Sequence, residues 1–162
     1  MMAREIMTRD VITVHLEDSV EKVARLLAEK GISGVPVVND ENKLVGIVTE
    51  GDFIVRSKKL RVPTYFQLLG GVIYFESPHR LEEELRKMTA TRVKDIMTED
   101  VISIVEETPI EEIATIMVEK KINRLPVVRN HKVVGIVSRS DLVKAMVGMK
   151  KPHHHGEERQ GE

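Results

Sequence analysis

The sequence contains an internal repeat, and this repeat limits the folds available to the chain. The stretch IMTRDVITVHLEDSVEKVARLLAEKGISGVPVVNDENKLVGIVTEGDFI begins at Ile6. It aligns with IMTEDVISIVEETPIEEIATIMVEKKINRLPVVRNHKVVGIVSRSDLV, which begins at Ile96. With one gap near Asn42, roughly two positions in five are identical, which indicates two copies of one supersecondary unit. Two copies are too few for a solenoid, so we expect a pair packed about a pseudo-two-fold axis.

Each copy predicts the same order of elements. A short strand (VITV or VISI) precedes a helix, two further strands (VPVV and KLVGIV, then LPVV and KVVGIV) and a final helix. The first helix has capping signals at Asp18 with Glu21 and at Thr108 with Glu111, and Gly31 is suited to end it. The strands are almost continuously hydrophobic, which is typical of strands buried on both faces. The predicted fold is therefore α/β (α+β), with two β-α-β-β-α repeats and a helical insert between them.

The repeats set the expected domain boundaries. Repeat 1 is predicted over residues 1–58, an aromatic-rich insert over 59–92, repeat 2 over 93–148 and a disordered, histidine-containing tail over 149–162. The insert holds most of the aromatic residues of the chain, and these could pack on the module itself or line a dimer contact. The histidines of the tail could bind nickel or zinc weakly, but a disordered tail is the simpler interpretation, so no metal site is assigned.

Composition excludes several classes of function. The formal net charge of −1 argues against a broad basic surface for nucleic acid or membrane. The absence of cysteine excludes thiol catalysis and cysteine metal sites, and it fits a reducing compartment. Because the sequence has neither a signal-peptide core nor a membrane-spanning run, we expect a cytoplasmic protein. It has no P-loop, nucleophile elbow or metalloprotease motif, so we assign no catalytic residue and expect no enzyme.

Each repeat carries a hydroxyl-x-x-aspartate turn at the end of its last strand. The first turn reads TEGD, with Thr49 and Asp52, and the second reads SRSD, with Ser138 and Asp141. A hydroxyl and an acid three residues apart resemble a capping box at a helix start. The same geometry suits a nucleotide, because helix N–H groups can bind phosphate and a carboxylate can accept two ribose hydroxyls. Both roles can hold at once.

The order of these motifs resembles a known family. MT-x-D-VI-x-V, I-x-x-hydrophobic-P-VV and GIV-[ST]-x-x-D are similar to the cystathionine-β-synthase (CBS) domain, over nearly all of residues 6–54 and 96–144. Two in tandem resemble a stand-alone Bateman module. The resemblance implies clefts that bind AMP or ATP, with S-adenosylmethionine as a further candidate. In these clefts the aspartate would take the ribose hydroxyls and the hydroxyl side chains would meet phosphate.

The resemblance also implies that each cleft combines the turn of one repeat with segments of the other. One cleft would join Asp141, Ser138 and Ser140 to Ile12, Ile32, Ser33, Gly34 and Val35. The other would join Asp52 and Thr49 to Ile102, Ile122, Asn123 and Leu125. Aliphatic side chains would then enclose a purine, although the ordinary interpretation of these residues is hydrophobic core.

The two predicted clefts differ in charge. The second turn carries Arg139, and repeat 2 has Arg124 where repeat 1 has Gly34. Arginine suits phosphate, and in the family a basic residue at this position often reaches phosphates. The first turn instead carries Glu50. We therefore expect the Asp141 cleft to hold the charged nucleotide, with Arg124 near the boundary between clefts, although both arginines could be solvated surface charges.

The sequence thus predicts a regulatory module. It would bind an adenine nucleotide and act through an unknown protein effector or through rearrangement of a homodimer. Two alternatives stay open, namely binding of an S-adenosyl compound and a protein-interaction module whose clefts are vestigial.

Overall fold

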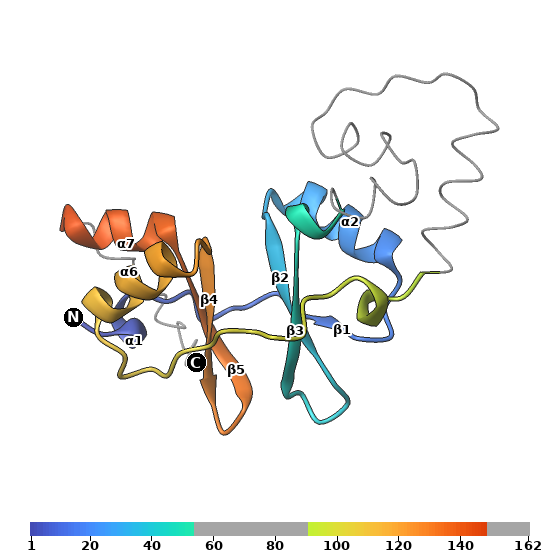
Figure 1. Ribbon diagram of the computed structural model, residues 1–162, viewed down its shortest axis with the longest axis horizontal. Coiled ribbons are helices and arrows are strands. Elements are labelled where there is room, and N and C mark those ends of the chain that lie inside the picture. Colours follow the sequence, from blue (N-terminus) through green and yellow to red (C-terminus); the bar gives the residue numbers. More distant parts are fainter. Residues whose placement is uncertain (54–90, 149–162) are drawn as a thin grey trace, which may run out of the picture.

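The computed structural model describes residues 1–53 and 91–148. Most of the predicted insert, including its aromatic residues, and the whole histidine tail lie outside the described residues. Figure 1 shows two halves side by side, each with a small sheet and helices packed against it. This arrangement confirms the predicted mixed α/β fold of two related units.

The first half contains a three-stranded sheet. Its elements are β1 (Val14–His15), α2 (Val20–Lys30), β2 (Gly34–Val38) and β3 (Leu44–Thr49). The sheet order is β1-β2-β3, with β1 parallel and β3 antiparallel to β2. Every residue of β2 is buried, as the continuous hydrophobic run predicts. Helix α2 covers the sheet through Val23 and Leu27, which are both fully buried.

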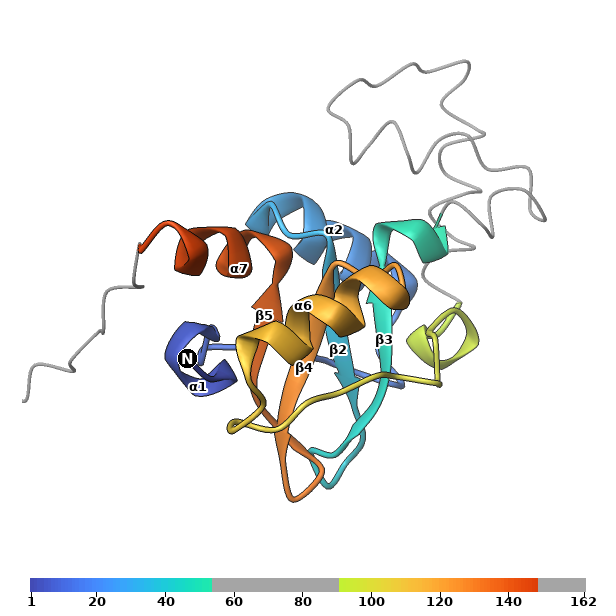
Figure 2. The ribbon, with the colours of Figure 1, turned by 60° about the vertical axis from the view of Figure 1, so that its left-hand side comes forward.

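The second half repeats this plan. Its elements are α6 (Ile110–Glu119), β4 (Arg124–Arg129), β5 (Lys132–Ser138) and α7 (Arg139–Met146). Strands β4 and β5 are antiparallel, and a single parallel bridge between Ile104 and Val127 takes the place of the third strand. The hairpin tips of the two halves meet where Leu44 N donates to His131 O at 2.9 Å, as Figure 2 shows from the side.

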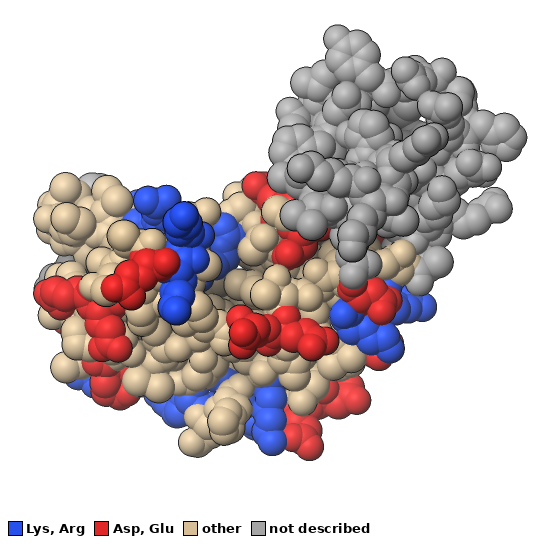
Figure 3. Space-filling model, in the orientation of Figure 1, with Lys and Arg blue, Asp and Glu red and all other residues tan. Residues whose placement is uncertain are grey.

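Acidic and basic side chains are mixed across the face shown in Figure 3, in keeping with the near-zero net charge. No helix among the described residues is long and apolar enough to span a bilayer.

The predicted first strands are too long. In VITV only Val14 pairs with β2, and in VISI only Ile104 forms a bridge. The preceding residues have no strand partner, and Val101 and Ile102 instead line a pocket between the repeats. Their hydrophobic character therefore does not indicate sheet pairing, since Ile102 also packs against the core of the second half.

The predicted helix caps are wrong by one residue. The N-cap of α2 is Ser19, whose Oγ accepts from Lys22 N at 3.2 Å. The Asp18 carboxylate instead accepts from His15 N at 2.8 Å. Helix α6 begins after Pro109 without a side-chain cap. In the same way, Thr108 Oγ1 accepts from Val105 N at 3.2 Å. Both residues that we expected to cap a helix therefore accept a hydrogen bond within the turn that precedes it.

The first residues of each repeat pack on the other repeat. Helix α1 (Ala3–Ile6) and Met7 belong to the hydrophobic core that contains β4, β5 and α6. The short 3-10 helix η1 (Val93–Asp95) and Ile96 belong to the core of the first half. Matching hydrogen bonds fix both segments, and Figure 1 shows α1 beside α6. The units of sequence and the units of packing therefore do not coincide.

Helix α2 ends at a left-handed Gly31, as the sequence predicts. Gly31 has φ 61°, and its equivalent in repeat 2 is Lys121 with φ 53°. Ile122 N bonds Met117 O at 3.1 Å, so the same helix ending is kept without glycine. A residue with a Cβ is strained in this conformation.

Replacing Lys121 with glycine is expected to raise the free energy of unfolding of the ligand-free protein by about 1 kcal/mol, because glycine adopts this φ without a Cβ penalty. Chemical denaturation measures the change. The matched control is Gly31→Ala, where no other group lies within 4 Å of the added Cβ. It should lower the stability by a similar amount. A loss of stability in Lys121→Gly would contradict the expectation.

Candidate functional site

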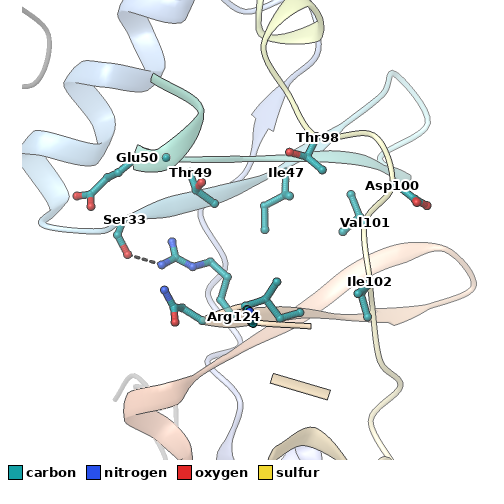
Figure 4. Close-up of a pocket in the computed structure, with 13 residues that line it drawn as sticks. Ser33, Ile47, Thr49, Glu50, Thr98, Asp100, Val101, Ile102 and Arg124 are labelled. Atoms are coloured by element: carbon teal, nitrogen blue, oxygen red, sulfur yellow. Dashed lines mark hydrogen bonds between the residues drawn. The ribbon is translucent and has the colours of Figure 1, made fainter. Parts of the chain in front are cut away.

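A pocket of about 390 Å³ lies between the two repeats. This volume is in the range that holds small-molecule ligands. Figure 4 shows its two walls. Repeat 1 contributes Ser33, Ile47, Thr49, Glu50 and Gly51, and repeat 2 contributes Thr98, Asp100, Val101, Ile102, Lys121, Ile122, Asn123 and Arg124. Thr98 lies on the same side as repeat 1 (Figure 4), because it pairs with Ile47 of β3.

The first hydroxyl-x-x-aspartate turn forms part of this pocket. Strand β3 ends at Thr49, and residues 50–53 are helical. Asp52 Oδ2 accepts from Thr49 N at 2.8 Å, which caps the helix start. Asp52 Oδ1 accepts from the hydroxyl of Thr98 at 3.3 Å. The carboxylate therefore joins two residues that line the pocket from different repeats.

The second turn is a complete capping box. Ser138 donates to Asp141 Oδ2 from both N and Oγ at 2.8 Å, and Asp141 N donates back to Ser138 Oγ at 3.4 Å. The Asp141 residue is 6% exposed. Arg139 Nη1 donates to Asn123 Oδ1 at 3.3 Å, and Ser140 is exposed. The helix-cap interpretation is therefore confirmed for this turn, while a ligand role for Asp141 stays a prediction.

Arg124 crosses from repeat 2 to repeat 1. It lies at the start of β4, and its Nη2 donates to the hydroxyl of Ser33 (Figure 4). The guanidinium lies over Gly34, where a Cβ would collide with Nη1. Burial lowers the pKa of Arg124, and this effect is larger than the opposing effect of the Glu50 charge, which raises the pKa. Arg124 is thus a partly desolvated cation in the pocket and not a solvated surface charge.

The structure brings together most of the residues predicted for the Asp52 cleft. Thr49, Ile102, Ile122 and Asn123 line one pocket, as the cross-repeat arrangement implied. Asp52 and Leu125 are not among the lining residues. Asp52 is bonded to two residues that are, Thr49 and Thr98, and the side chain of Leu125 is fully buried in the core of repeat 2. The binding roles of these residues stay predictions.

The residues predicted for the Asp141 cleft are placed differently. Ser33 lines the Thr49 pocket, because Arg124 binds its hydroxyl. Val35 is fully buried in the core of repeat 1, and Ile12 and Ile32 pack against that core. Their side chains therefore belong mainly to the core, which was the ordinary alternative.

Sequence reasoning missed several pocket residues, namely Ile47, Thr98, Asp100, Val101 and Lys121. Thr98 and Asp100 belong to the MT-x-D motif, and Lys121 replaces a glycine of the other repeat, so these three were visible as motif positions. Their place in the pocket depends on packing between repeats. Within residues 1–53 and 91–148, no three His, Asp or Glu side chains form a group suited to a metal ion.

Comparison with known families identifies the two units. The model of the CBS domain matches residues 3–59 and residues 93–148. The chain belongs to the CBS domain family. The two matched segments make it a tandem CBS pair, and the pocket described above lies between the two CBS domains.

Relatives of this CBS pair include proteins of similar and of greater length. An uncharacterized protein of Methanocaldococcus jannaschii is 32% identical, over 91% of this chain and 92% of its own. The inosine-5′-monophosphate dehydrogenase of the same organism is 31% identical over 88% of this chain. This chain spans only 23% of the length of that enzyme.

Two solved structures share the fold. The crystal structure of CBSX2 in complex with AMP has a TM-score of 0.69 and 26% identity, over 91% of this chain and 97% of that chain. The CBS domain pair of protein MJ0100, in complex with 5′-methylthioadenosine and S-adenosyl-L-methionine, has a TM-score of 0.67 and 26% identity, over the same shares of both chains.

Proposed function

We propose that this CBS pair is a regulatory module that binds an adenosyl ligand between its two domains. AMP or ATP is the first candidate, and an S-adenosyl compound is the alternative. The observation that carries the proposal is the pocket shared by the two repeats, with an aspartate-capped turn in one wall and aliphatic and cationic groups in the other. The AMP and S-adenosyl-L-methionine complexes of similar CBS pairs support the same class of ligand.

The pocket offers suitable groups for each part of such a ligand. Val101, Ile102 and Ile122 provide an apolar surface for a purine. Asp52 does not line the pocket itself, but it is bonded to the lining residues Thr49 and Thr98, and its carboxylate can accept ribose hydroxyls. Arg124 and Lys121 provide positive charge for phosphates, while Glu50 and Asp100 oppose it. This mixture of positive and negative groups is compatible both with anionic nucleotides and with S-adenosyl compounds.

A ligand in this pocket contacts both domains, so it favours the arrangement of repeats that it bridges. We infer a cytoplasmic homodimer that passes this change to an unknown protein effector or through its own interface, without catalysis. A module with vestigial clefts is the competing possibility, and it predicts no response to adenosyl compounds.

AMP at a hundredfold excess over Kd is expected to stabilise the protein by about 2.7 kcal/mol, because it binds only the folded state. Differential scanning fluorimetry should show this as a rise of several degrees in Tm. Asp52→Asn keeps an oxygen for the helix cap but loses the charge and one acceptor, so most of the rise should disappear. The matched control is Asp40→Asn, an exposed acid on the β2–β3 hairpin that pairs with His15.

Asp40→Asn should retain the full rise. An unchanged Tm with AMP, ATP, S-adenosylmethionine and 5′-methylthioadenosine would refute the proposed function and favour vestigial clefts.

A further inference from the structure

We propose that the chain binds its adenosyl ligand at one cleft only, the Thr49 pocket, and that Arg124 keeps the pseudo-symmetric second cleft from forming. This inference rests on the proposed function and adds the stoichiometry of that site and the residue that decides it.

The first argument is the asymmetry of one pair of equivalent positions. Arg124 and Gly34 occupy the same place in the two repeats, directly before the buried strand segments LPVV and VPVV. The arginine crosses to repeat 1 because Gly34 has no side chain to obstruct it, and an added Cβ would collide with the guanidinium. Repeat 1 offers no side chain at Gly34 to make the reciprocal contact. At this pair of positions, repeat 2 therefore extends a side chain onto repeat 1, and repeat 1 extends none onto repeat 2.

The second argument concerns the wall that the second cleft would need. In the Thr49 pocket, the wall includes Ile122, Asn123 and Arg124. The equivalent wall of the second cleft is the segment 32–34. Arg124 binds the Ser33 hydroxyl and covers Gly34, and Ser33 lines the Thr49 pocket instead. Arg124 thus adds a positive charge to the Thr49 pocket, and it also covers part of the segment 32–34 that would form a wall of the second cleft.

The third argument is that the polar groups of the second turn already have protein partners. Asp141 is 6% exposed and receives two 2.8 Å hydrogen bonds from Ser138. The Ser138 hydroxyl is thereby engaged, and Arg139 donates to Asn123. In the first turn, Asp52 also accepts from Thr49 N at 2.8 Å and from the Thr98 hydroxyl at 3.3 Å. It is nevertheless more exposed than Asp141, and its contact with the Thr49 hydroxyl is longer, at 3.4 Å. The Thr49 turn is therefore the better prepared for a ligand.

Isothermal titration calorimetry with AMP tests the stoichiometry. The wild-type chain is expected to bind one AMP per chain, and Asp52→Asn is expected to weaken that binding at least tenfold. Binding that persists unchanged in Asp52→Asn would show that the first turn does not hold the ligand and would overturn the inference. Asp40→Asn serves as the control for loss of an acid.

Arg124→Ala tests the role of the arginine. Its removal releases Ser33 and uncovers Gly34, so a second site should appear and the stoichiometry should approach two. Adenosine is titrated in parallel, because it has no phosphate and is insensitive to the lost cation. Circular dichroism and Tm establish that the variant is folded. If it is not, Ser33→Ala removes the same hydrogen bond while keeping the charge, and a second site is again expected.

The outcomes separate the two proposals. Two AMP molecules on the wild-type chain, or a single site in folded Arg124→Ala and Ser33→Ala alike, would overturn the inference and leave the proposed function in place. No binding of AMP, adenosine or S-adenosylmethionine to the wild-type chain would overturn both.

Discussion

Replacing Ile6 with alanine is expected to lower the free energy of unfolding by about 2–5 kcal/mol, the usual cost of emptying a buried isoleucine site. Ile6 is 6% exposed and packs in the core of the second half, although it belongs to the first repeat. Urea denaturation measures the total loss. Native-state hydrogen exchange should show that amides of β4 and β5 lose more protection than those of β2 and β3.

The pseudo-symmetric variant Ile96→Ala should give the opposite pattern, because Ile96 packs in the core of the first half. Val118→Ala is the surface control, since Val118 is 74% exposed on α6 and should change the stability by less than about 0.5 kcal/mol. If Ile6→Ala instead reduced the protection of β2 and β3 more than that of β4 and β5, the packing of Ile6 on the second half would not be its main contribution to stability.

Gly34→Ala is expected to destabilise the protein by about 1–3 kcal/mol, because the added methyl overpacks a filled site. The nearest obstacle is the Arg124 guanidinium, and Thr49 Cγ2 and Val48 O lie at 3.0 Å from the new Cβ. The arginine must leave, which breaks its hydrogen bond to Ser33. Thermal and chemical denaturation of the ligand-free protein measure this loss.

A double-mutant cycle identifies the part due to Arg124. In an Arg124→Ala background the methyl has more room, so Gly34→Ala should cost at least about 1 kcal/mol less than in the wild type. Equal costs in the two backgrounds would mean that the contacts with Val48 and Thr49 cause the whole effect. The cycle thus measures the energetic coupling between Gly34 and Arg124, which occupy equivalent positions in the two repeats.

Much of the fold is predictable from the repeat. Buried strands of five or six residues next to amphipathic helices have local signals, and Gly31 marks a helix end. The caps were misplaced because Asp18 and Ser19 are both good N-cap residues, and sequence alone does not show that Asp18 is used by the preceding turn. The packing of α1 was not predicted, because a hydrophobic side chain does not indicate which of two similar cores it joins.

The site was predictable to a similar degree. The motif resemblance placed Thr49 with Ile102, Ile122 and Asn123, which the structure brings to one pocket. It could not place Arg124, because a long side chain can reach in several directions. Its direction is decided by an empty position in the other repeat, Gly34. Arg124, which we expected near the boundary between the two clefts, therefore lies in the Thr49 pocket.

The crossing of α1 also has a consequence for how the protein is made. Ala3, Ile6 and Met7 leave the ribosome before any residue of β4 or β5, yet they are part of the core that those strands build. These three side chains therefore cannot reach their core positions until most of the chain has been synthesised. Neither repeat can finish folding while the other is absent, so the two halves should complete their folding together, after translation has passed α7.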